Sequence, residues 1–172
     1  MSSTKKKVLF AVVLTLTATF GGCVLQAKSL INSYEIEGIS LLSHRSELIE
    51  DGWKGAAGSN TVAELSNGRT TVLVVFWGER VCSIEGRSLS IGSHTFATGE
   101  DASSIQSLLG NPSALLPSHL RQGSPGDLTT QGFVRRTFLG LPVLNVGIEY
   151  KGRKVRTYLL SLHLPEFFQP DV

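Results

Sequence analysis

The sequence predicts an α+β fold of two tandem units, each with a short hairpin, one helix and a three-stranded antiparallel meander. Two internal matches carry this prediction. Residues 36–41 and 84–89 share five of six amino acids at an offset of 48, and residues 72–81 match 146–155 at an offset of 74. Matches at a fixed offset are typical of duplicated supersecondary units. Because strand side chains alternate between faces, agreement at every second residue preserves a buried face.

The first predicted unit covers residues 34–83. Residues 34–42 alternate around Glu37-Gly38 like a hairpin. A short helix is expected over 45–50, with Ser43 as the capping candidate and Glu47 in the first turn. Strands over 61–66 and 69–77 flank Asn67-Gly68, a pair that favours a type I′ turn. A last strand over 80–85 then leads into the second unit.

The second predicted unit covers residues 84–172 and repeats this order at greater length. Its hairpin is expected over 84–91, and its helix over 100–109 ends at Gly110-Asn111-Pro112. A proline- and glycine-rich loop over 111–132 follows, and a loop of this length inside a compact domain is often functional. Residues 121–156 hold seven basic residues against two acidic ones.

The N-terminus has the pattern of an export signal. Lys5-Lys6-Lys7 precede a stretch without charge over residues 8–27, which is apolar up to Phe20 except for three threonines. Small residues then precede Cys23, and this arrangement resembles the lipobox of bacterial lipoproteins, which implies cleavage before Cys23 and lipid on its sulfur. We therefore predict a signal peptide over 1–22, a tether over 23–33 and an exported, membrane-anchored protein.

Two other readings of this segment remain open. Leu25-Gln26-Ala27 has the small final residue of an ordinary secretory signal, cleaved before Lys28. Residues 8–27 are also just long enough for an uncleaved membrane anchor. All three readings place the rest of the chain outside the cytoplasm.

Charge and cysteine usage set further limits. Without Lys5, Lys6 and Lys7, 13 basic residues face 14 acidic ones, so the basic balance belongs to the precursor and gives no reason to expect nucleic-acid binding. If Cys23 carries lipid, Cys82 is left alone in an apolar strand pattern. A free cysteine in such a place behaves as a small buried hydrophobe.

A family resemblance appears in the second unit. The run Ser-Leu-Leu-Gly-Asn-Pro over 107–112, the following loop, and the strand patterns over 138–158 resemble the units of small outer-membrane assembly lipoproteins of the SmpA/OmlA kind. Secreted β-lactamase inhibitor proteins are built from units of similar shape. The resemblance covers about 75 residues, and in the first unit Asp51-Gly52-Trp53 stands in place of the motif. It implies protein binding at the envelope without catalysis.

Catalytic and metal-binding patterns do not appear in the sequence. The histidines, His44, His94, His119 and His163, lie too far apart for the spacing of a metal motif. There is no G-x-S-x-G elbow, no phosphate-binding loop and no Cys-x-x-Cys. We therefore expect no cofactor, no metal and no enzymatic activity, although catalytic groups can assemble from distant residues.

The best binding candidate is a group of cations in the second unit. Lys154, Arg156 and Tyr158 are expected on one strand face, with Arg153 at the hairpin tip and Arg135 or Arg136 on a preceding strand. Such a face suits an anionic lipid or glycan surface, or an acidic protein. A solvated face with edge-protecting charges is the plainer reading.

These observations favour an exported, lipid-anchored protein that binds another macromolecule at the envelope. An inhibitor or immunity-type protein, and a hydrolase with scattered catalytic residues, are the alternatives.

Overall fold

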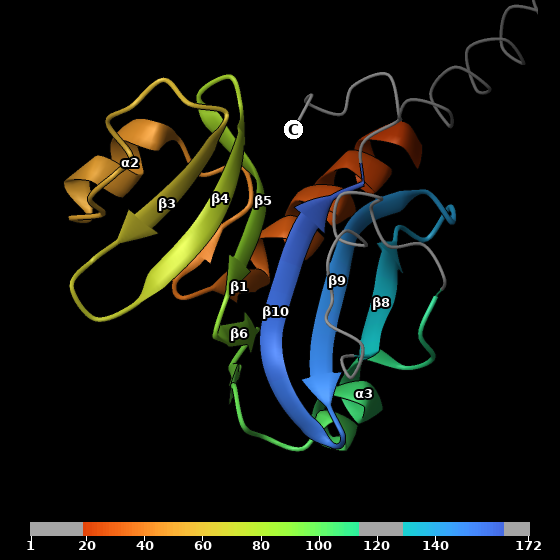
Figure 1. Ribbon diagram of the computed structural model, residues 1–172. Coiled ribbons are helices and arrows are strands. Elements are labelled where there is room, and N and C mark those ends of the chain that lie inside the picture. Colours follow the sequence, from red (N-terminus) through yellow and green to blue (C-terminus); the bar gives the residue numbers. More distant parts are fainter. Residues whose placement is uncertain (1–18, 114–128, 164–172) are drawn as a thin grey trace, which may run out of the picture.

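A computed structural model describes residues 19–113 and 129–163 of the chain. The predicted signal segment before residue 19, residues 114–128 of the long loop, including His119, and the last nine residues lie outside the described ranges. The described part contains helices and two antiparallel sheets, which confirms the α+β class (Figure 1).

A helical stretch over residues 19–32 comes first. The elements that follow are β1 (Tyr34–Ile36), β2 (Ile39–Ser40), α2 (Arg45–Glu50), β3 (Val62–Ser66), β4 (Thr71–Trp77), β5 (Arg80–Gly86), β6 (Ser88–Ile91), β7 (His94–Ala97), α3 (Ala102–Leu109), β8 (Thr129–Arg136), β9 (Pro142–Lys151) and β10 (Lys154–Leu162).

The larger sheet has six strands in the order β3-β4-β5-β10-β9-β8, and the smaller has four in the order β2-β1-β6-β7. The smaller sheet, α3 and the N-terminal helical stretch lie behind the larger sheet in the view of Figure 1. We call this covered side the inner face, and it carries Val74, Ile84 and Val146 in one cross-strand row. The opposite side is the outer face.

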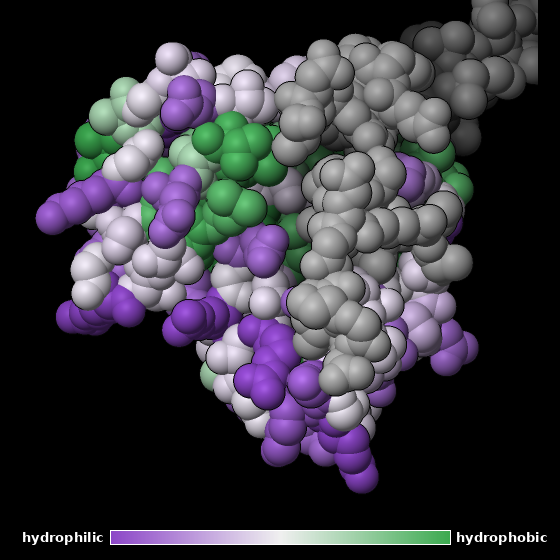
Figure 2. Space-filling model, in the orientation of Figure 1, coloured by the Kyte–Doolittle hydropathy of each residue, from purple (hydrophilic) through white to green (hydrophobic). Residues whose placement is uncertain are grey.

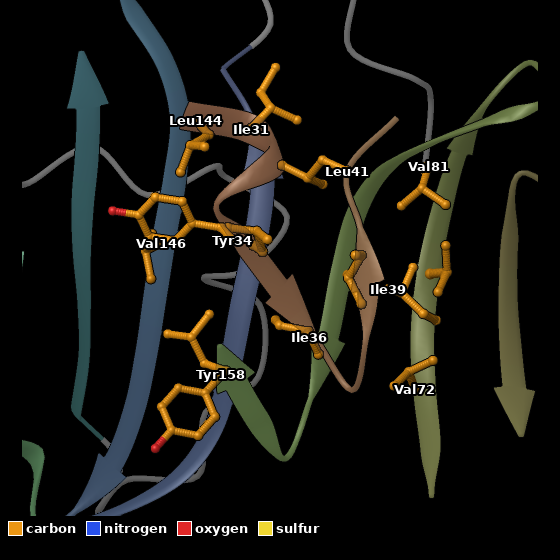
Figure 3. Packing of buried hydrophobic residues seen from close by; sticks show 14 of the residues in the cluster. Ile31, Tyr34, Ile36, Ile39, Leu41, Val72, Val81, Leu144, Val146 and Tyr158 are labelled. Carbon is orange, nitrogen blue, oxygen red and sulfur yellow. The ribbon is translucent and has the colours of Figure 1, made fainter. Parts of the chain in front are cut away.

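The core fills the space between the inner face and the smaller sheet (Figure 3). Ile36 of β1 is fully buried and lies between Val72 of β4 and Tyr158 of β10. Each large apolar side chain buried in this way contributes about 1.5–3 kcal/mol to folding. The hydroxyl of Tyr158 donates to the carbonyl of Ala97, 3.0 Å away, so its polar end is also satisfied.

The helix predicted over residues 45–50 is confirmed, but its cap differs from the expectation. The N-cap is His44, whose side chain accepts from the backbone of Ser46, while the Glu47 carboxylate accepts from the His44 backbone in a capping box. The prediction of Ser43 as the cap is wrong by one residue. Imidazole nitrogen serves here as the acceptor that a hydroxyl usually provides.

The turn between β3 and β4 also differs from the predicted type I′ pair. Residues 67–70 separate the strands, and among them Gly68 alone has positive φ, at 83°. The Asn67 side chain accepts from the backbone N–H groups of Arg69 and Thr70. Asn67 therefore stabilises the turn through its amide oxygen, as in an Asx turn.

The two copies of the repeated hexapeptide adopt different structures, which corrects the expected match between 34–42 and 84–91. Glu37 and Gly38 have positive φ and form the turn between β1 and β2. Glu85 and Gly86 instead end β5, and β6 begins after Arg87. Strand β5 thus runs across the predicted boundary between residues 83 and 84.

The segment predicted as a tether is helical. Its packed side repeats at helical spacing and includes Cys23 and Ile31, which are 6% and 8% exposed. Ile31 belongs to the core cluster, close to Leu144 of β9 (Figure 3). The stretch before Tyr34 is therefore part of the folded domain.

Candidate functional site

The predicted group of cations divides into two parts at opposite ends of the larger sheet. In the β8–β9–β10 ladder, Arg135 pairs with Leu144 near the start of β9, whereas Lys154 pairs with Lys151 at its end. Seven residues of strand separate Leu144 from Lys151, a distance of about 23 Å. Arg135 and Arg136 therefore do not join the other three cations.

Arg153, Lys154 and Arg156 lie together at the tip of the β9–β10 hairpin, and we call them the basic end. All three are exposed. Arg153 Nε lies 3.1 Å from Asp101 Oδ2, and Asp101 caps α3. Hydrogen bonds from Ser103, and then the charges of Arg153 and Lys154, lower the pKa of Asp101. Hydrophilic residues gather at this lower end of the molecule in Figure 2.

Tyr158 does not share the face of Lys154 and Arg156, contrary to the prediction. The register of β10 against β9 shifts between Val155 and Thr157, so Arg156 is an extra residue in a β-bulge. The bulge reverses the alternation beyond it, and both Val155 and Tyr158 enter the core. Burial raises the pKa of Tyr158 far above its usual range.

Arg135 and Arg136 point to opposite sides of β8. Arg135 donates to the carbonyl of Leu109 at the end of α3 and lies beside the phenol of Tyr34. Burial raises the pKa of Tyr34, and Arg135 partly offsets that rise. Arg136 is exposed and donates to the carbonyl of Gly140 in the β8–β9 turn, 2.9 Å away.

The two cysteines are both buried free thiols. Cys23, the predicted lipidation site, lies on the packed side of the N-terminal helical stretch. Cys82 occupies the bulge where the β4–β5 register shifts, and its thiol donates to the carbonyl of Val75. Burial raises the pKa of Cys82 to about 11, so this thiol is nearly all protonated and poorly nucleophilic at neutral pH.

The histidines within the described ranges lie apart from one another. His44 caps α2, His94 is exposed at the start of β7, and His163 follows β10. His163 Nδ1 lies 3.5 Å from Asn145 Oδ1, and burial together with Arg136 lowers its pKa. Across residues 19–113 and 129–163, no cluster of His, Cys, Asp or Glu has the arrangement of a metal site.

The outer face of the larger sheet has features that the sequence analysis missed. Leu73 and Trp77 of β4 are 42% and 50% exposed, and Figure 2 shows an apolar patch over β4 and β5. Glu85 lies next to Leu73 in the register, and burial followed by the charge of Glu149 raises its pKa. The sequence signal for this patch was Leu73, because the alternation of the predicted strand places it on the face opposite the core.

Three polar side chains on the outer face are buried at adjoining positions. Ser83 pairs with Ser161, and Ser161 pairs with Asn145. Their exposed fractions are 5%, 3% and 4%, and Ser161 Oγ has no hydrogen-bond partner. Ser161 and His163 therefore both lie near Asn145. The close contact of His163 is with the side-chain amide oxygen of Asn145 and not with a serine hydroxyl.

The turn between β8 and β9 exposes a second apolar group. Phe138, Leu139 and Leu141 are 59%, 52% and 54% exposed, and we call them the apolar tip. The backbone N–H of Phe138 donates to Gln26 Oε1 of the N-terminal helical stretch, 2.7 Å away. In the sequence, the signal for an exposed turn was Gly140 within an apolar run. In the structure Gly140 has a positive φ of 76°.

Comparison of the chain with protein-family models, with curated proteins and with solved structures finds no match. Among helices in the described ranges, none combines enough length with enough apolar character to cross a bilayer.

Proposed function

We propose that this is an exported, non-enzymatic protein, attached to a membrane near Cys23, that binds an acidic envelope protein through the basic end. The observation that carries the proposal is the position of Arg153, Lys154 and Arg156. They are exposed at the end of the larger sheet opposite the β8–β9 turn, which contacts the N-terminal helical stretch. Attachment near Cys23 would direct the basic end away from the membrane.

This placement favours a macromolecule outside the bilayer over the head groups of the anchoring membrane. Residues 142–151 of β9 separate the two ends, about 30 Å at the rise of an extended strand. That distance exceeds the Debye length of about 8 Å at physiological salt, so the basic end would be screened from the lipid surface. The resemblance to envelope assembly lipoproteins, which concerns protein binding, agrees with this choice.

Lipid on Cys23 fits the helical stretch if cleavage occurs just before this residue. Cys23 would then be the first residue of the helix, where backbone N–H groups have no intrahelical partner and ends fray. Fraying would free the sulfur from the packed position that it has in the intact chain. Cleavage before Lys28 would instead remove part of the packed side of the helical stretch.

The attachment is tested with Cys23→Ala. We expect this variant to lose metabolic lipid labelling and to accumulate as unprocessed or released protein. Unchanged processing and membrane retention would reject the lipoprotein assignment.

The binding proposal is tested with Lys154→Glu combined with Arg156→Glu. Crosslinking in cells should capture much less partner with this variant, whereas the unfolding midpoint should change little because both side chains are exposed. Lys54→Glu with Arg69→Glu is the matched control, since it changes the net charge equally at another exposed lysine and another exposed arginine. Equal capture by both variants would overturn the proposal, and an isolated glycan in place of a protein would correct the partner class.

We also propose that the fold is a fused pair of equivalent units that meet at Arg87. The 74-residue offset relates the Gly78 turn to the Gly152 turn and the bulge at Cys82 to the bulge at Arg156. The contacts of the helix starts correspond as well. Val81 N–H donates to Ser43 O at 3.0 Å in the first half, and Val155 N–H donates to Glu100 O at 3.0 Å in the second.

A second candidate function, an inhibitor-type protein, is favoured by Leu73 and Trp77 on the outer face. A half-exposed tryptophan is typical of the anchors in protein interfaces, and Leu73 adds exposed apolar area on the same strand. Trp53 is buried, so a blue shift of tryptophan emission on partner binding would report on Trp77. Loss of capture in Trp77→Ala, with capture kept in the basic-end variant, would favour this candidate.

A further inference from the structure

The apolar tip and the N-terminal helical stretch form one exposed apolar surface. The hydrogen bond from Phe138 N–H to Gln26 Oε1, 2.7 Å long, joins them. Val24 and Leu25 of the helical stretch, which follow the proposed lipidated Cys23, are 53% and 71% exposed. Large apolar side chains are thus exposed on both segments at the same end of the molecule.

The outward side of the helical stretch changes from apolar to polar at a defined level. From Cys23 on, its exposed residues are Val24 and Leu25, and then Lys28, Ser29 and Asn32. Gln26, which accepts the hydrogen bond from the tip, directly follows the apolar pair. The side chains of the tip and of Val24 and Leu25 therefore suit one apolar medium, and the water-facing part of the helical stretch begins at Lys28.

A bilayer surface that holds the lipid on Cys23 has this layout, because Cys23 directly precedes Val24 and Leu25 in the sequence. We propose that the apolar tip inserts into the bilayer surface beside the point where the chain is attached. A partner protein would have to cover the tip and the apolar side of the helical stretch together, next to the attachment point.

The tip is built to keep its side chains outward. Thr137 N–H donates to Leu141 O at 2.9 Å, and Gly140 N–H donates to Thr137 O at 2.8 Å, so the turn is closed by its own backbone. Arg136 also donates to Gly140 O. Its exposed guanidinium stands next to the tip, at the depth where anionic lipid head groups attract cations.

This inference rests on the proposed membrane attachment and fixes the orientation of the domain above the bilayer. With the tip in the bilayer surface, the strands of the larger sheet lead away from the membrane and the basic end is farthest from it. Two attachment points, the N-terminal segment and the tip, restrict rotation of the domain, whereas a single anchor would leave it free to swivel.

The test uses the full chain purified from membranes and reconstituted into vesicles of phosphatidylethanolamine and phosphatidylglycerol. A Leu139→Cys variant carries an environment-sensitive fluorophore, in a Cys82→Ala background. Leu73→Cys is the matched control, because Leu73 is a leucine of similar exposure located midway along β4. We expect a blue-shifted emission and strong quenching by lipid-borne quenchers at position 139, and neither at position 73.

A second variant guards against a trivial effect of the label. With the label moved to Leu141→Cys, the change Leu139→Asp should return the emission to that of water and leave vesicle flotation unchanged, since attachment is N-terminal. Burial of one leucine is worth about tenfold or more in partitioning, so one aspartate should be enough to displace the tip.

The outcomes separate this inference from the proposed function. Flotation with a label in water at position 139 overturns the inference and leaves the attachment intact. Failure to float with vesicles overturns both. A label that is shielded in cells but exposed to water in protein-free vesicles assigns the tip to a protein partner and overturns insertion.

Discussion

The guanidinium of Arg45 lies 3.7 Å from the centroid of the Phe76 ring and is 6% exposed. It donates to the carbonyl of Ala56 at 3.1 Å and to that of Asn60 at 3.0 Å, and also to Gly58. Its Nε is 3.5 Å from a carboxylate oxygen of Glu79. One buried cation therefore fixes the long connection between α2 and β3, for which the sequence predicted neither helix nor strand.

We expect Arg45→Lys to lower the free energy of unfolding by about 2–3 kcal/mol, because an ammonium cannot reproduce the planar fork or reach all three carbonyls. Urea unfolding measures the change. Arg80→Lys is the control, since Arg80 is exposed and makes one hydrogen bond to Leu42 O. Equal effects of the two substitutions would contradict this role for Arg45.

Glu85 should make stability depend on acid pH. Burial and Glu149 raise its pKa in the folded protein above the unfolded value of 4.5. The folded state therefore binds this proton more tightly, so its contribution is favourable below the unfolded pKa and is lost as pH rises through the folded pKa. Glu85→Gln should be more stable than the native protein near about pH 7, and this gain should vanish below about pH 4.

Denaturant unfolding of both proteins at matched pH values checks this expectation. The comparison of variant with native protein at each pH removes the titration of other groups. A stability difference that stays constant from acid to neutral pH would show that Glu85 ionises normally.

At the scale of elements, the repeated hexapeptide shows what local sequence leaves open. Gly38 is needed for a turn, with φ of 81° and open space around its Cα. Gly86 is needed for close approach, because a Cβ there would lie 2.5 Å from Ile36 Cγ2 and 3.2 Å from Val72 Cγ1. Glycine is thus required for its backbone conformation in the first copy and for close sheet-to-sheet packing in the second. Packing is a tertiary property, so the local sequence does not reveal it.

Gly86→Ala should therefore destabilise the protein by about 1–3 kcal/mol, the usual cost of overpacking a filled core. Thermal or urea unfolding measures it. Gly58→Ala is the matched control, because a Cβ there would have its nearest contact at 4.0 Å and φ is not positive. Similar losses from both substitutions would contradict the contact with Ile36 as the cause, because the lower entropy of the unfolded alanine chain by itself favours the folded state.

The 74-residue match predicted strands correctly because alternation is a local property, and β4, β5, β9 and β10 lie over the matched ranges. The β-bulge at Arg156 could not be predicted from the alternation of the sequence. An extra residue in one strand is defined by its pairing with the neighbouring strand, so Tyr158 was assigned to the wrong face.

At the scale of the whole molecule, the predicted cation group divides because the sequence does not specify which strand ends meet. The sequence analysis grouped Arg135 and Arg136 with the later cations because they lie on a preceding strand. Antiparallel pairing of β8 with β9 places both arginines at the opposite end of the larger sheet. The sequence predicted the basic end itself, Arg153, Lys154 and Arg156, since these lie within one hairpin.

The two halves should not fold independently. Strand β5 pairs with β10 through Ile84 and Leu160, and β1 pairs with β6 through Ile36 and Leu89, so both sheets are continuous across the halves. A fragment of residues 19–86 would expose Ile36 and Ile84, which are fully buried in the whole chain, and two strand edges. At about 1.5–3 kcal/mol for each side chain, the loss is of the same order as the whole stability of a small domain.

We therefore expect the 19–86 fragment to have poorly dispersed amide signals in NMR spectra, and the full chain to unfold in one cooperative transition by both near- and far-ultraviolet circular dichroism. Mixing the fragment with one that begins at Arg87 should restore dispersed signals, because the missing edges β5 and β10 are then supplied to each other. A dispersed spectrum from the first fragment alone, or two separate transitions in the full chain, would instead mean that the units are independent domains joined at Arg87.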